Sequence, residues 1–176
     1  MNWMQRLEKL DRRIVFVIMF IAVSIPVLVR LDMPIPSSKE VDDYYDAIEK
    51  LPDGSAVFFP ADFDPGSVAE LEPMMRTSLR HLFRKDCKVV CFTLWDTGPG
   101  IVDAIIRDEA QRAHKEYGVD YVFLGFKAGR EVIMVQIANS ISGVFPQDYT
   151  GKDTKSLPLM QQVDKLTDTR LIVNIS

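Results

Sequence analysis

Polar and charged residues follow each of four apolar runs in the sequence, and they are the first candidates for chemistry. If the runs are parallel strands, their carboxyl ends meet at one edge of a sheet, where ligands gather in open α/β proteins. Loops at strand ends are polar in most proteins, so this edge is only a candidate ligand site. Its members would be Asp62 and Asp64, then Asp96, Thr97, Gly98 and Gly100, then Lys127 and Arg130, and finally Asn174 and Ser176.

The stretch FFPADFDPG, residues 58–66, places two aspartates directly after the first apolar run. It resembles the haloacid dehalogenase-type phosphohydrolases, and the resemblance implies that Asp62 attacks a phosphoryl group and Asp64 protonates the leaving oxygen. By the same resemblance, Thr93 would bind phosphate and Lys127 would balance charge around Mg²⁺. The chain departs from that pattern because no paired carboxylates accompany its last apolar run, Thr93 lies inside its run, and Lys127 follows a different element. We favour the alternative in which Asp64 opens a turn and Asp62 caps backbone amides.

The stretch DTGPG, residues 96–100, supplies a second candidate site. Glycines ahead of a helix let backbone amides approach an anion, and the helix dipole favours negative charge there. The stretch has neither the spacing of a dinucleotide-binding motif nor the Lys-Ser/Thr pair of a P-loop. A turn between a strand and a helix, with Asp96 as the helix cap and Gly98 at a positive φ, explains the same residues. The ligand-binding candidates are therefore Asp96, Thr97, Gly98, Gly100 and Lys127.

Other nucleophilic or metal chemistry finds little support in the sequence. His81 and His114 fall on helical stretches with solvated faces, and there is no G-x-S-x-G nucleophile elbow. Cys87 and Cys91 lie too far apart along one strand for a disulfide, and no Cys/His spacing is typical of a metal site. We expect neither a cofactor nor a metal, with Mg²⁺ required only in the phosphohydrolase alternative.

Helical and apolar stretches alternate along the chain after residue 36. The apolar runs lack a polar alternation, which is typical of strands that helices cover on both faces. The pattern predicts an α/β fold, a three-layer sandwich with a mostly parallel sheet of about four strands. EVIMVQIA, residues 131–138, also fits a strand, but Ile133, Ile137 and Ile141 at four-residue spacing favour a helix. The expected strands are 55–62, 88–95, 120–126 and 170–176, and the expected helices are about 37–51, 67–84, 98–118, which Gly118 closes, and 129–141.

An apolar stretch near the start of the chain predicts a membrane anchor. Residues 14–29 carry no charge and would form roughly 24 Å of helix, and Leu31 extends the apolar run. We predict a transmembrane helix over residues 14–31. A cleaved signal peptide would end in a cleavage site of small residues, which this stretch does not have. A core helix would show a polar stripe facing water, which this stretch also lacks.

The charges flanking this stretch predict its orientation. Residues 1–13 carry four basic side chains, which favours the cytoplasmic side of the membrane. We therefore expect a cytoplasmic leader over 1–13, a Pro-rich spacer over 32–38 and an extracytoplasmic α/β domain over 39–176 in the cytoplasmic membrane. Beyond residue 30, 16 Lys and Arg residues against 23 Asp and Glu residues give a net charge of −7, which argues against nucleic acid as a partner.

The second half of the chain, from CKVVCF to LIVNIS, resembles a family of uncharacterised bacterial membrane-anchored α/β proteins. The resemblance is carried by YGVDYVFLGFKAGREVIMVQIANSISGVFPQDYTGKDTKSLPLM, residues 117–160. It implies the same architecture and no established activity. We expect a non-enzymatic subunit or binding module of a cell-envelope complex, in contact with the bilayer through residues 14–31 and with a membrane-protein partner. The alternative is a Mg-dependent, membrane-tethered phosphohydrolase that uses the Asp-x-Asp motif.

Overall fold

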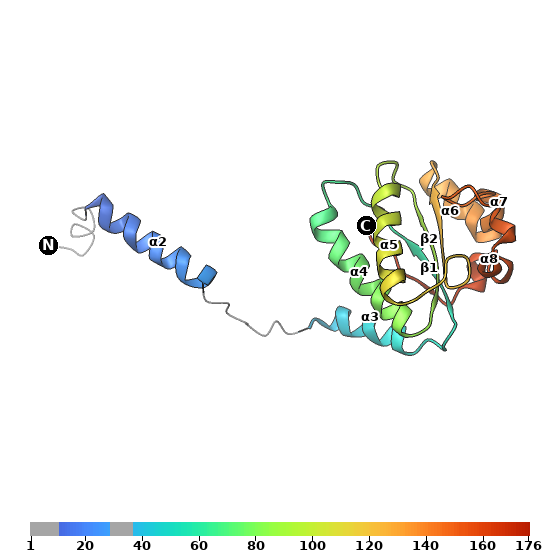
Figure 1. Ribbon diagram of the computed structural model, residues 1–176, viewed down its shortest axis with the longest axis horizontal. Helices are drawn as coiled ribbons and strands as arrows, with labels where there is room; N and C mark the ends of the chain where they lie inside the picture. Colours follow the sequence, from blue (N-terminus) through green and yellow to red (C-terminus); the bar gives the residue numbers. More distant parts are fainter. Residues whose placement is uncertain (1–10, 29–36) are drawn as a thin grey trace. The chain divides into compact units, whose positions relative to one another are not determined.

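The computed structural model describes residues 11–28 and 37–176 (Figure 1). The chain divides into two compact units, Met1–Ser38 and Lys39–Ser176. The first unit contains helix α2 (Arg12–Leu28), and the second contains the sheet and the helices packed on it.

Helix α2 spans 17 residues, and its large apolar side chains are exposed along its length. Within the described ranges, no helix is both long enough and apolar enough to cross a bilayer. The predicted span over 14–31 runs past Leu28 into residues 29–31, which lie outside the described residues, as do residues 1–10 of the predicted leader and 32–36 of the predicted spacer.

The second unit is built on a parallel sheet, as predicted. Its strand order is β3-β2-β1-β4, and every neighbouring pair is parallel. The central pair aligns Val57 with Val89 and Phe59 with Cys91. The strands are β1 (Ala56–Pro60), β2 (Lys88–Thr93), β3 (Tyr121–Phe126) and β4 (Leu171–Ile172).

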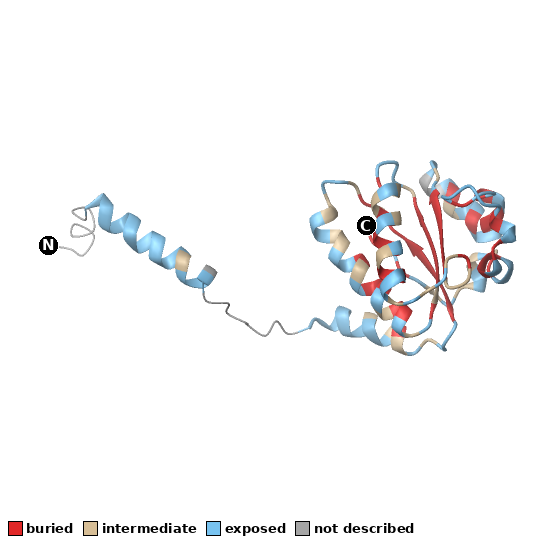
Figure 2. Ribbon diagram, viewed as in Figure 1, coloured by how far each residue is buried: buried red, intermediate tan, exposed pale blue. Residues whose placement is uncertain are grey.

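Helices cover both faces of the sheet, which confirms the three-layer α/β sandwich (Figure 2). Alternate strand residues point to opposite faces, so Val57 and Phe59 enter one core and Phe58 enters the other. The first core is closed by α3 (Lys39–Glu49), α4 (Val68–Arg84) and α5 (Pro99–Arg112). The second is closed by α6 (Arg130–Asn139), α7 (Ile141–Val144) and α8 (Pro158–Gln162), with the short 3-10 helices η1 (Thr154–Ser156) and η2 (Leu166–Asp168) nearby in the chain.

Several element ends differ from the prediction. Helix α5 ends at Arg112, and the left-handed residue that follows it is His114 (φ 55°), whereas Gly118 (φ 86°) lies in a later turn. The helix expected to run through Ile141 breaks at Ser140, whose hydroxyl accepts a hydrogen bond from the Gly143 amide and caps α7. The last strand is only two residues long, although an isolated bridge pairs Ile175 with Ala61 beyond it.

Candidate functional site

The carboxyl edge of the sheet gathers the residues that the sequence singled out. Asp62 follows β1, Thr93 ends β2, and Lys127 follows β3. The main-chain amide of Lys127 donates a hydrogen bond to the Thr93 carbonyl at the same edge. The parallel topology therefore brings these residues together, as expected for an open α/β sheet.

The Asp62 carboxylate joins the ends of neighbouring strands. Its Oδ1 accepts hydrogen bonds from the Thr93 hydroxyl, at 3.1 Å, and from the Leu94 amide. The main-chain amide of Asp62 donates to the Ile175 carbonyl at 2.7 Å. These bonds agree with the interpretation of Asp62 as a cap for backbone amides, because each one satisfies a group at the end of a strand.

Asp64 holds the turn that leads into α4. Its Oδ1 accepts hydrogen bonds from the amides of Gly66, at 2.8 Å, and Ser67, at 3.0 Å. Ser67 itself makes no capping bond to the helix, so Asp64 supplies the acceptor at this end. A carboxylate held in this way is poorly placed to protonate a leaving group.

The bonded oxygens of Asp62 and Asp64 serve the backbone and do not converge on one point. Mg²⁺ is usually held by one or two carboxylates together with waters, whereas Oδ1 of Asp62 and Oδ1 of Asp64 accept hydrogen bonds from different backbone amides. In the part of the chain that the structure describes, no group of three or more His, Cys, Asp or Glu side chains could hold a metal ion.

The DTGPG stretch forms a tight connection between β2 and α5. Gly98, and not Asp96, occupies the N-cap position, and its φ of −81° shows that the expected positive φ is wrong. A Cβ at Gly98 would lie 2.8 Å from the Phe63 carbonyl oxygen, so close backbone approach explains this glycine. Gly100 lies in the first turn of α5, and beyond the adjacent residues and the backbone of its own helix nothing lies within 4 Å of the position that its Cβ would occupy.

A small cavity of about 260 Å³ opens beside this connection. Its two aromatic residues, Trp95 and Phe126, are partly exposed, and Asp96 is the one charged residue among the described side chains that line it. Thr97, Gly98, Gly100 and Lys127 do not line it. The cavity offers an apolar surface to a ligand, and its lining residues are Leu94, Trp95, Asp96, Phe126, Ala128 and Gly129.

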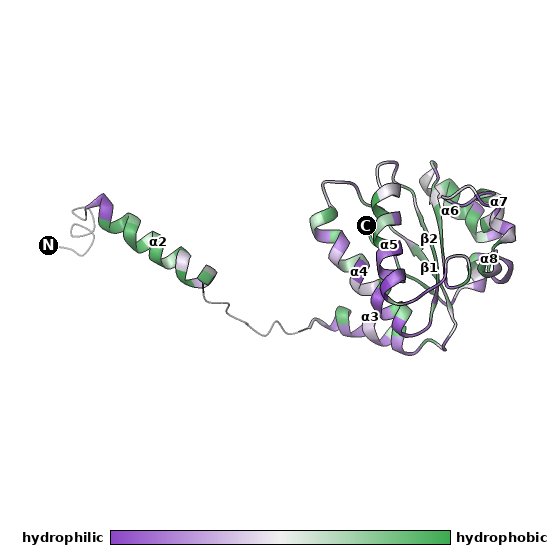
Figure 3. Cartoon of the chain, viewed as in Figure 1, coloured by the Kyte–Doolittle hydropathy of each residue, from purple (hydrophilic) through white to green (hydrophobic). Residues whose placement is uncertain are grey.

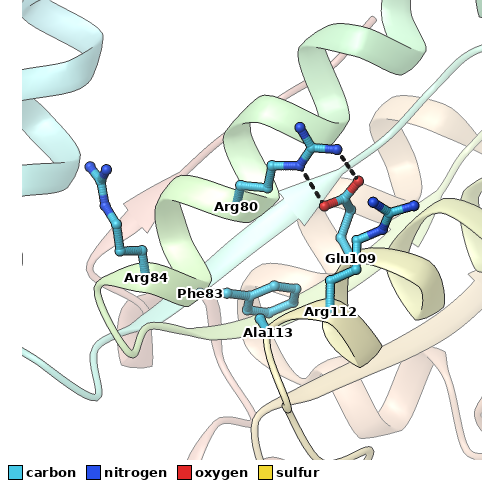
Figure 4. A pocket seen from close by; sticks show the side chains of 6 residues that line it. All are labelled: Arg80, Phe83, Arg84, Glu109, Arg112 and Ala113. Carbon is cyan, nitrogen blue, oxygen red and sulfur yellow. Dashed lines mark hydrogen bonds and ion pairs between the residues drawn. The ribbon is translucent and has the colours of Figure 1, made fainter.

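A cluster of ion pairs between α4 and α5 was not predicted from the sequence. The Glu109 side chain is fully buried, with 0% exposed. Arg80 donates from Nε to Glu109 Oε2 at 2.7 Å and from Nη2 to Oε1 at 2.9 Å (Figure 4). Arg76 donates to Glu109 Oε1 at 2.8 Å, to Glu72 Oε1 at 2.8 Å and to Asp108. The cluster fixes the pairing of the two helices.

These contacts keep Glu109 charged despite its burial. The hydrogen bond from Arg80 lowers the pKa of Glu109 below its ordinary value, burial opposes that effect, and Arg76 adds to it. The same carboxylate raises the pKa of Arg76 above its ordinary value. The sequence signal for this cluster is the four-residue spacing of Arg76, Arg80 and Arg84 along α4.

A second cavity, of about 340 Å³, lies beside the buried carboxylate. We call it the α4–α5 groove. Figure 4 shows the ring of Phe83 between the side chains of Arg84 and Arg112. The lining residues of the groove are Arg80, Phe83, Arg84, Glu109, Arg112 and Ala113.

Comparison with known proteins gives no name for this arrangement. No protein-family model, curated protein or solved structure matches the chain. The resemblance to membrane-anchored α/β proteins therefore stays a prediction.

Proposed function

We propose that the chain is a single-pass, membrane-anchored α/β module that acts as a non-enzymatic subunit or binding module of a cell-envelope complex. In this proposal residues 14–31 lie in the cytoplasmic membrane, the N-terminus is inside, and residues 39–176 form a domain outside. The domain contacts a membrane-protein partner.

The exposed apolar surface of α2 carries the proposal. Figure 3 shows hydrophobic residues along α2, whereas α4 and α5 carry hydrophilic residues among their hydrophobic ones. The exposed side chains of α2 include Phe16, Ile18, Phe20 and Leu28. Burial of each large apolar side chain is worth roughly 1.5–3 kcal/mol, so this helix gains strongly from a hydrocarbon environment.

The carboxylates at the sheet edge support a binding role over catalysis. Oδ1 of Asp62 and Oδ1 of Asp64 each accept hydrogen bonds from backbone amides. A nucleophile or general acid has to reach the substrate instead.

The membrane topology can be tested on intact spheroplasts. We expect protease added outside to digest the α/β domain, and we expect alkaline carbonate to leave the undigested chain in the membrane pellet. A cytoplasmic protein that stays intact until lysis is the control for spheroplast integrity. Protection of the domain until lysis would contradict the orientation, and release by carbonate would contradict the anchor.

One observation favours the phosphohydrolase alternative. The hydroxyl of Thr93, which the resemblance assigns to phosphate binding, lies 3.1 Å from Oδ1 of Asp62, its proposed nucleophile, at the carboxyl end of the sheet. The test compares the full-length chain with its Asp62→Asn variant on a generic phosphate ester with Mg²⁺. We expect negligible turnover by both proteins, and circular dichroism should show that the variant is folded, since the Asn carbonyl still accepts hydrogen bonds. Turnover by the unaltered chain that Asp62→Asn abolishes would establish the enzyme instead.

A further inference from the structure

Arginines are concentrated on one surface of an otherwise acidic domain. Seven arginines occur beyond residue 30, and four of them lie on α4 and α5: Arg76 and Arg80 bind Glu109, and Arg84 and Arg112 line the α4–α5 groove beside it. The four-residue spacing along α4 places the first three on one face of that helix. The domain as a whole carries more acidic than basic residues, and the carboxylates Glu49 and Asp108, which pair with Arg84 and Arg112, are less exposed than those arginines, at 35% and 37%.

The four arginines differ in how much of their donor capacity is used inside the fold. Arg76 binds three carboxylates, and only 25% of its side chain is exposed, so its role is structural. Arg112 donates from Nε to Asp108 at 3.2 Å and is 63% exposed. Arg84 reaches Glu49 at 3.3 Å through Nη2 and is 65% exposed. The hydrogen bonds of Arg84 and Arg112 with described residues thus use one nitrogen of each guanidinium.

Arg80 combines a fixed position with exposure to solvent. Two bonds to a fully buried carboxylate hold the guanidinium, while 58% of the Arg80 side chain is exposed. A positioned guanidinium loses less entropy on binding an anion than a freely rotating one.

The groove between these arginines combines positive charge with an apolar base. Phe83 and Ala113 line it together with Arg80, Arg84 and Arg112 (Figure 4). Because its three arginines are more than half exposed, the groove cannot enclose a small molecule on all sides. It suits a segment of another protein that lies along the two helices.

We propose that the α4–α5 groove binds an acidic segment of a protein partner. Carboxylates of the segment pair with Arg84 and Arg112, and an apolar side chain between them covers Phe83 and Ala113. Guanidinium groups match carboxylates through paired hydrogen bonds, and the acidic remainder of the domain repels the segment from other sites. The inference rests on the proposed binding function and specifies its partner surface.

Fluorescence anisotropy of a labelled peptide of alternating glutamate and leucine tests this proposal. The full-length chain in non-ionic detergent is titrated into the peptide, and the double variant Arg84→Gln/Arg112→Gln is expected to weaken binding about tenfold or more. The matched control is Arg107→Gln/Arg170→Gln, which removes the same charge from the same domain outside the groove. We expect the control to bind like the unaltered chain.

Four outcomes would overturn the inference. They are no binding by the unaltered chain, equal loss in both double variants, equal binding of a glutamine–leucine peptide, and full displacement of the peptide by inorganic phosphate at equal charge concentration. The spheroplast experiment does not depend on Arg84 or Arg112. Absence of peptide binding at the groove together with retained anchoring therefore rejects this inference alone. Loss of anchoring rejects the proposed membrane module.

Discussion

Replacing Glu109 with alanine is expected to lower the free energy of unfolding by about 3 kcal/mol, because it removes the acceptor shared by two arginines at the α4–α5 interface. The fully buried carboxylate accepts two hydrogen bonds from Arg80 and one from Arg76. Removal of Glu109 takes the paired carboxylate away from Arg80, whereas Arg76 keeps Glu72 and Asp108. The Arg80 side chain can still reach water, which places the cost at the lower end of the usual range. Urea unfolding of the full-length chain, followed by circular dichroism, measures the change.

Two variants separate the buried charge from lost helix contacts. Glu116→Ala removes an exposed glutamate and is expected to change stability by less than about 0.5 kcal/mol. The triple variant Arg76→Met/Arg80→Met/Glu109→Leu removes the buried carboxylate together with the two arginines that bind it. It is expected to lose less stability than Glu109→Ala alone, since Glu72 and Asp108, which lose Arg76, are 32% and 37% exposed and stay solvated. A triple variant less stable than Glu109→Ala would show that the ion pairs contribute more than their desolvation costs.

The contribution of Glu109 should also depend on pH with a definite sign. The hydrogen bond from Arg80 lowers the pKa of Glu109 in the folded state below its ordinary value of 4.5. The carboxylate therefore stabilises the fold fully above that value and loses its contribution as the pH falls through the lower folded pKa. The stability difference between the unaltered chain and Glu109→Gln should shrink on acidification below pH 4.5. A difference that grows on acidification would contradict the lowered pKa.

The sheet was predictable because its strands are buried on both faces. Strands β1, β2 and β3 are continuous apolar runs, and almost all of their residues are buried. The ambiguous stretch before residue 139 is a helix, as predicted, with Ile133 and Ile137 buried and Val132 exposed. A strand would place Val135 on the same face as Ile133 and Ile137, but Val135 is exposed, so the burial pattern follows the helical period.

Helix ends were less predictable, because distant residues determine them. The break at Ser140 involves Asp164, which accepts hydrogen bonds from the Ser142 amide and the Ser140 hydroxyl across 22 and 24 positions of sequence. No local rule signals that contact. At the end of α5, the preference for glycine in the left-handed region pointed to Gly118, but His114 adopts that conformation.

At the candidate site, the position of a residue in the chain was predictable, but its hydrogen-bond partner was not. The sequence correctly put Asp62 at the end of a strand, but its hydrogen bond to the Leu94 amide spans 32 residues. The burial of Glu109 likewise depends on the packing of α5 against α4, where the arginines that bind it lie 29 and 33 residues away. Residue types predict candidate chemistry, and the packing of separate elements decides which side chains meet.

Gly98→Ala is expected to destabilise the domain by about 2 kcal/mol, and the cause is steric rather than conformational. The added Cβ would lie 2.8 Å from the Phe63 carbonyl oxygen and 3.3 Å from the Thr93 hydroxyl. A backbone carbonyl cannot rotate away as a flexible side chain can, so the connections after β1 and β2 must separate. The φ of −81° is acceptable for alanine, which excludes backbone strain at position 98 itself. Thermal and urea unfolding of the full-length chain measure the loss.

Gly100→Ala is the matched control, because it makes the same substitution two residues away in the first turn of α5. Apart from the adjacent residues and the backbone of its own helix, nothing lies within 4 Å of the new Cβ. Alanine is a better helix former than glycine by up to about 1 kcal/mol, so this variant should be as stable as the unaltered chain or more stable. Opposite signs for the two variants would locate the effect in the contact between Gly98 and Phe63. Equal stability of the two variants would contradict that contact, and with it the close approach of the connections that follow β1 and β2.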